Sequence, residues 1–220
     1  MFRLSRLIAI AAVSVVLLAP GTAAATSEEA EPTVSLRWAL GALETDAAAP
    51  NSIQRDTQLT TGTRLKFLVE PLSAGTVYLI LLDSDDEISV LYRQPSVRST
   101  DGSEPTYIPP GSQWFELDSR AGMETFFLLA SVEPLPDLQA LIDKHDAADA
   151  AVKKTLGTDI VAEIRRLHKQ HRNFARPVEK PVIIGGQTRG ENDDPTAAID
   201  RLAVEVSAEN FYGKTITIDH

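Results

Sequence analysis

The fold of this chain is decided by residues 76–92, which read TVYLILLDSDDEISVLY. The first seven residues form a strongly apolar run with β-branched and aromatic side chains, which predicts a central strand. The four residues that follow predict a turn, because Asp and Ser favour turns through local hydrogen bonds. Residues 87–92 predict the partner strand, with Ile88, Val90 and Tyr92 on one face. We therefore predict a β-hairpin in this stretch.

Working outward from this hairpin, other short runs predict further strands. Val34 to Gly41 alternates with the period of two that is typical of a half-buried strand. Met123 to Ser131 is a second strongly apolar run, and Pro134 and Pro136 end it. Shorter runs of the same kind predict strands at 65–69, 113–117, 182–184, 202–206 and 214–218. The chain is therefore rich in short strands.

Between about 136 and 172 the apolar period changes to that of a helix. Leu138, Leu141 and Ile142 recur at helical spacing, and the following Ala-rich residues continue this tendency. Gly157 and Thr158 predict a boundary between two helices, because Gly weakens a helix and Thr can cap one. The section therefore predicts a helical hairpin, which Pro177 and Pro181 close.

The order of these elements predicts the fold class. Strands precede helices in a block and do not alternate with them, which argues against a doubly wound parallel sheet. We predict a mainly β fold of the α+β type: an antiparallel β-sandwich with a late inserted helical hairpin. The single domain covers 34–220, follows a disordered linker at 26–33, and ends in closing strands (181–218) that complete the same sheet.

The first 25 residues have the three parts of a secretory signal peptide. Arg3 and Arg6 precede an apolar run from Leu7 to Ala19, and Ala23 to Ala25 offers a small-residue cleavage site. The apolar run is shorter than the roughly 20 residues that a membrane-spanning helix needs. We therefore expect an exported protein, periplasmic or extracellular, whose mature chain has no transmembrane segment.

Composition narrows the range of partners and chemistry. The chain has 21 Lys and Arg against 31 Asp and Glu, a formal net charge of −10. Such a surface repels nucleic acid and anionic lipid at long range, so we expect no nucleic-acid partner. Cysteine is absent, which excludes disulfides and thiolate metal sites. No cofactor is predicted, because no cofactor-binding motif withstands inspection.

Several segments carry a resemblance to a known family. Residues 77–81 read Val-Tyr-Leu-Ile-Leu, residues 91–95 read Leu-Tyr-Arg-Gln-Pro, and residues 108–111 read Ile-Pro-Pro-Gly. With the strand at 122–131, this order of features over about 56–138 resembles the bacterial family known as domain of unknown function 4384. At the hairpin turn the family usually has a glycine, and this chain has none. The family has no established activity, so the resemblance implies an interaction or sensing accessory and no site residues.

Two glycine-containing segments are candidates for anion binding. Gly213-Lys214-Thr215 ends like a phosphate-binding loop, but the required earlier glycine is Ala208 and the segment lies between predicted strands, so we predict no phosphate site. Gly185, Gly186 and Arg189 follow a predicted strand and combine backbone amides with a cation. They can bind a small anion, or they can form an ordinary surface turn.

Two groups of residues are weak candidates for a metal. Asp83, Asp85 and Glu87 offer the carboxylates that Ca²⁺ prefers, but the turn lacks the spacing of a calcium motif. His168 and His171 are three residues apart on a predicted helix and can meet Glu163 or Asp159, yet no third strong zinc ligand follows. We therefore predict no metal site.

Aromatic residues offer the last candidate surface. Most of them lie on predicted strands and are expected in the core, whereas Tyr107 and Trp114 flank a loop at 96–111 that is rich in Ser, Pro and Gly. We predict an exported, non-catalytic β-sandwich that binds a protein or an envelope component through this loop. Two alternatives stay open: a small-anion sensor built on Gly185 to Gly190, and an extracytoplasmic hydrolase whose cleft gathers acids with His168 or His171.

Overall fold

The computed structural model describes residues 32–94, 104–172, 177–181 and 195–220. All of these belong to one unit, Glu31–His220. The predicted signal peptide at 1–25, the predicted strand at 182–184, and the anion-site candidates Gly185, Gly186 and Arg189 lie outside the described residues.

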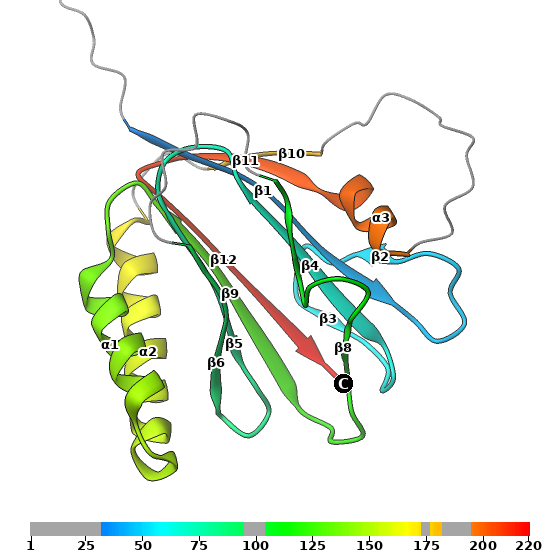
Figure 1. The fold of residues 1–220 in the computed structure, drawn as a ribbon, viewed down its shortest axis with the longest axis horizontal. Helices are drawn as coiled ribbons and strands as arrows, with labels where there is room; N and C mark the ends of the chain where they lie inside the picture. The colour runs from blue at the N-terminus through cyan, green and yellow to red at the C-terminus, as the bar shows by residue number, and fades with distance from the viewer. Residues whose placement is uncertain (1–31, 95–103, 173–176, 182–194) are drawn as a thin grey trace, which may run out of the picture. The chain divides into compact units, whose positions relative to one another are not determined.

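Two sheets face each other and form a β-sandwich (Figure 1). Sheet A has the order β10-β11-β1-β4-β7, with β2 beside β1 and β8 beside β4. Its strands are β1 (Thr33–Leu43), β2 (Asn51–Ser52), β4 (Arg64–Pro71), β7 (Thr106–Ile108), β8 (Phe115–Glu116), β10 (Val178–Pro181) and β11 (Val204–Glu209). Sheet B has the order β3-β12-β9-β5-β6. Its strands are β3 (Thr57–Gln58), β5 (Thr76–Leu82), β6 (Ile88–Gln94), β9 (Met123–Ser131) and β12 (Phe211–Asp219).

The prediction of an antiparallel β-sandwich is confirmed. Only the short pairing of β3 with β12 is parallel among the described strand pairs. Alternate residues of both sheets point into the space between them, where Leu36, Trp38 and Leu79 are almost completely buried. Phe67 of sheet A and Phe126 of sheet B meet there with ring centroids 4.9 Å apart. The period of two therefore produced the inter-sheet core.

The hairpin predicted at residues 76–92 is confirmed, with one correction. β5 pairs with β6, but the register shifts between Leu79 and Ile80 because Leu91 is an extra residue on β6. Such a bulge reverses the alternation of faces beyond it. Ile88 and Val90 pack on the outer face of sheet B, whereas Tyr92 packs between the sheets. The prediction that Tyr92 shares a face with them is therefore wrong.

A helical hairpin covers the outer face of sheet B (Figure 1). It consists of α1 (Pro136–Ala147) and α2 (Ala150–Gln170). The predicted boundary at Gly157 is wrong: the break falls at Ala148 and Asp149, and the Asp149 carboxylate caps α2 by accepting the Val152 backbone N–H. Gly157 lies inside α2, where a Cβ would be only 3.2 Å from Ile88 Cγ1. Close approach to the sheet explains this glycine.

Three further predictions are corrected by strand pairing. The closing strands do not complete the same sheet, because β11 pairs with β1 in sheet A and β12 pairs with β9 in sheet B. Pro181 does not simply close the helical section, because it ends the edge strand β10. Part of the loop at 96–111 is not exposed: Thr106–Ile108 forms β7 against β4, and Ile108 is buried.

Two short helices, α3 (Pro195–Ile199) and the 3-10 helix η1 (Asp200–Leu202), precede β11. Ile199 packs with Ala39 and Leu68 on the outer face of sheet A. Across the described part of the chain, no helix has the length and apolar character needed to cross a membrane.

Candidate functional site

The aromatic residues predicted to bind a partner meet around a buried lysine on sheet A. Lys66 Nζ lies 6.0 Å from the ring centroid of Tyr107 and 5.4 Å from that of Trp114. The ammonium donates hydrogen bonds to the carbonyl oxygens of Gly111, at 2.7 Å, and Gln113, at 2.6 Å. Lys66 is completely buried, so its charge is satisfied by these carbonyls and the two ring faces.

Tyr107 and Trp114 also hold α3 and η1 on the sandwich. Both side chains are half-buried and pack against the cluster of Ala39, Leu68, Ile199 and Ala203. The Tyr107 hydroxyl donates to Asp200 Oδ2 at 2.8 Å, and the other oxygen of this carboxylate accepts a hydrogen bond from Arg37. The two rings therefore have a structural role, and partner binding through them stays a prediction.

The acidic turn between β5 and β6 uses its carboxylates locally. Asp83 Oδ1 accepts the backbone N–H groups of Asp85, at 3.0 Å, and Glu87, at 2.8 Å. Asp85 Oδ2 accepts a hydrogen bond from Arg120 Nη1 at 2.8 Å. Within the ranges that the structure describes, no group of three or more metal-ligating side chains is positioned to hold an ion. This arrangement is a hydrogen-bonded turn.

The two histidines of α2 lie against the aromatic ring of Phe211. His171 stacks on Phe211 with ring centroids 4.5 Å apart, and His168 meets it edge-on at 6.1 Å. His168 also covers Gly213, where a Cβ would lie 2.3 Å from the imidazole Nε2. The glycine of the phosphate-loop-like segment is therefore explained by helix packing, since Gly213 lies within β12.

A cleft of about 320 Å³ opens between the end of α2 and the connection from β9 to α1. We call it the hairpin cleft, and its polar lining includes Ser131, Glu133, Asp137, Glu163, Arg166 and His171. The packing of the two helices brings these residues together from β9, from the connection to α1, from α1, and from α2 with its C-cap residue. Of the two histidines named as hydrolase candidates, only His171 lines the cleft. His168 packs against Gly213 of β12.

Arg166 is the paired cation of the hairpin cleft. Arg166 donates from Nε to Glu163 Oε2 at 2.7 Å and from Nη2 to Glu163 Oε1 at 2.6 Å. Arg166 Nη1 donates to Gln170 Oε1 at 2.8 Å. Burial, and secondarily the positive charge of Arg166, lowers the pKa of His171. The imidazole is therefore neutral at neutral pH, beside a fixed carboxylate–guanidinium pair.

Lowered histidine pKa values make the docking of the helical hairpin sensitive to pH. Burial lowers the pKa of His168 as well. In the unfolded chain the pKa of a histidine is about 6.5. The unfolded chain then binds more protons, so stability is present above that pH and falls as the pH drops toward the folded pKa. We expect a lower free energy of unfolding at pH 5.5 than at pH 7.5, measured by urea denaturation.

His168→Gln removes one of the two titrating groups and keeps a polar side chain. It should therefore make the pH dependence of the free energy of unfolding shallower. An equal slope in wild type and His168→Gln would contradict the assignment.

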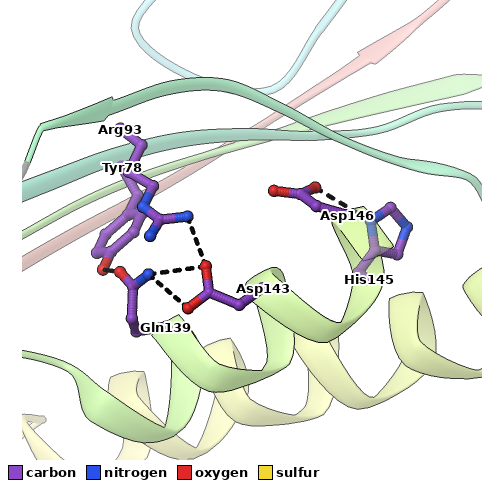
Figure 2. Close-up of polar contacts among 6 residues, drawn as sticks. All are labelled: Tyr78, Arg93, Gln139, Asp143, His145 and Asp146. Atoms are coloured by element: carbon purple, nitrogen blue, oxygen red, sulfur yellow. Dashed lines mark hydrogen bonds and ion pairs between the residues drawn. The ribbon is translucent and has the colours of Figure 1, made fainter. Parts of the chain in front are cut away.

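A polar cluster missed by the sequence reasoning fastens α1 to sheet B (Figure 2). The Tyr78 hydroxyl donates to Gln139 Oε1 at 2.8 Å, and Gln139 Nε2 donates to both oxygens of Asp143 at 3.0 Å. Arg93 Nη1 of β6 donates to Asp143 Oδ1 at 3.0 Å. Hydrogen bonds from Gln139 and then Arg93 lower the pKa of Asp143. The spacing of four between Gln139 and Asp143 was the available sequence signal.

Comparisons of this chain with protein-family models, with curated proteins and with solved structures found no match. The resemblance to the family of unknown function therefore stays a prediction. What the structure itself defines is a β-sandwich that carries a helical hairpin with a cleft at one end.

Proposed function

We propose that this protein is an exported, non-catalytic accessory module that binds a protein or another envelope component through its helical hairpin. The observation that supports the proposal is the hairpin cleft, a preformed hollow of about 320 Å³. Clefts that combine apolar walls with a few oriented polar groups are typical binding sites. The predicted signal peptide supports export.

The same cleft favours binding over hydrolysis, although it contains residue types that a hydrolase uses. Nucleophilic catalysis needs a nucleophile within hydrogen-bond reach of a base. Here the Ser131 hydroxyl donates to the Asn210 carbonyl oxygen at 3.4 Å, and both oxygens of Glu163 accept from Arg166. The His171 ring stacks on Phe211. Each group is thus engaged in holding the structure.

Cross-linked affinity capture from the native envelope tests the proposal. We expect the wild-type chain to recover one dominant protein in stoichiometric amount. Glu133→Arg combined with Asp137→Arg, two exposed positions on the cleft, should reduce this recovery by roughly tenfold, because both charges that the cleft presents at these positions are reversed where the partner makes contact.

The matched control is Glu44→Arg combined with Asp46→Arg. It makes the same change in charge at exposed residues that follow β1, and it should leave recovery unchanged. If the wild type recovers no stoichiometric partner, the binding proposal is wrong. The two alternatives, a hydrolase and a small-anion sensor, would then be tested.

A further inference from the structure

One exposed face of α2 carries a row of cations. Lys154, Arg165 and Lys169 of α2 are exposed, and their spacings of eleven and four residues place them on one side of the helix. Arg172, in the turn that follows α2, is exposed as well. The row runs about 22 Å from Lys154 to Lys169. We call these four residues the cationic face.

The cationic face is unneutralised within the part of the chain that is described. There, none of its four side chains takes part in an ion pair or accepts or donates a side-chain hydrogen bond. The neighbouring Arg166 is different, since Glu163 neutralises it. Helix α2 has five Lys and Arg against two acids, whereas the whole chain has a net charge of −10. The positive field is therefore local.

A groove with both apolar and charged residues in its lining lies beside the cationic face. This hollow of about 280 Å³ separates α2 from the turn between β5 and β6, with Leu82, Gly157 and Val161 in its lining. Lys154 and Arg165 of the cationic face line the same hollow. A partner can therefore meet positive charges and an apolar surface together, which gives both affinity and orientation.

We propose that the cationic face and this groove bind an acidic protein segment that has at least one apolar side chain. Charge complementarity selects the occupant, because four unpaired cations along α2 and the turn after it match a segment with several carboxylates. A broad anionic surface fits less well. Asp86 lines the groove and Asp85 and Glu87 are its exposed neighbours. A short segment can put its apolar side chain there and its carboxylates on the cations, whereas a continuous sheet of negative charge, such as an anionic bilayer, meets these acids and is repelled.

The inference rests on the proposed function, since it names the class of partner, and it adds a second contact for that partner on α2, separate from the hairpin cleft. Binding can be measured by fluorescence anisotropy with a labelled peptide of repeating Glu-Glu-Leu-Glu. The comparison probes are the same peptide with Lys in place of Glu, and vesicles containing phosphatidylglycerol. We expect the acidic peptide alone to bind, and the affinity to fall as salt is added.

Charge reversal tests the surface. Lys154→Glu, Arg165→Glu and Lys169→Glu together should weaken the acidic peptide by roughly tenfold or more. Arg55→Glu, Lys180→Glu and Arg201→Glu make the same change in net charge at exposed positions away from α2 and should change affinity by less than about twofold. Circular dichroism and urea denaturation establish that both triple variants fold.

Three outcomes would overturn the inference. They are an equal loss of peptide affinity in both triple variants, no binding of the acidic peptide at low salt, and binding of the vesicles as tight as that of the peptide. Its failure is distinguishable from that of the proposed function. If capture recovers the same stoichiometric partner with the α2 triple variant, the inference falls and the binding function stands. If the wild type captures no partner, the proposed function fails whatever the peptide does.

Discussion

Lys66→Met is expected to lower the free energy of unfolding by about 2 to 4 kcal/mol. The lysine is completely buried, and its ammonium holds the carbonyl oxygens of Gly111 and Gln113. Methionine matches the length of the lysine stem but donates no hydrogen bond. It also removes the cation that lies between the rings of Tyr107 and Trp114. The expected loss of stability therefore has two sources: two charge-assisted hydrogen bonds, and the loop at Gly111 and Gln113 that these bonds hold in place.

Urea denaturation measures this loss, and Lys180→Met is the matched control because Lys180 is exposed on the edge strand β10. The control should change stability by less than about 0.5 kcal/mol. Trp114 fluorescence should also change in Lys66→Met, since the indole loses its cation. If both lysine variants were equally stable, the hydrogen bonds of Lys66 would not hold this loop.

Gly75→Ala is expected to cost about 3 kcal/mol or more. Gly75 joins β4 to β5 and has φ of +152°, a backbone conformation that side-chain-bearing residues rarely adopt. A Cβ there would lie 2.6 Å from the backbone oxygen of Ser131. Backbone cannot rotate away as a side chain can, so either β5 or β9 must shift.

The comparison variant separates strain from steric clash. Gly111 also has positive φ, at +62°, but a Cβ there would meet nothing within 4 Å. Gly111→Ala should therefore cost only about 1 to 2 kcal/mol, the strain of the backbone alone. Denaturation of both variants tests the difference. Equal costs would show that contact with Ser131 does not limit residue 75.

Gly75→Ala, the glycine variant with the larger expected loss of stability, should also affect the hairpin cleft. Ser131 is part of the cleft lining, and Thr76 is its partner in the pairing of β5 with β9. A shift of β9 at Ser131 would move the cleft floor relative to α2. Capture of a partner should therefore weaken in Gly75→Ala even below its unfolding temperature.

Much of the fold could be predicted because local patterns encode it. The apolar run at Met123 to Ser131 predicted β9 with its bounds, and the acidic turn predicted the hairpin of β5 and β6. Such elements depend on side-chain alternation and turn chemistry within a few residues. The errors arose where pairing or packing between segments departs from this local signal. Leu91 is an extra residue in the pairing of β6 with β5, and Gly157 stays helical where α2 approaches Ile88.

The candidate sites show the same division. The sequence brought Tyr107 and Trp114 forward as exposed aromatics, but the lysine that they share is an ordinary strand residue until β4 meets β7 and β8. His171 and Glu163 are near each other on α2, yet their cleft with Ser131 exists only after the helical hairpin docks on sheet B. Nothing in the sequence around Gly213 indicates that the His168 imidazole packs over it.

By itself the sequence determined the β-rich class, the position of most strands, the presence of a helical section, and the acidic, cysteine-free surface. Those properties follow from periodicity and composition, which each segment carries alone. Tertiary structure decided which sheet each closing strand joins, where the helices break, and which charges are paired. These depend on contacts between segments far apart in the chain, and the free energy of such contacts is shared by both partners and cannot be assigned from either segment alone.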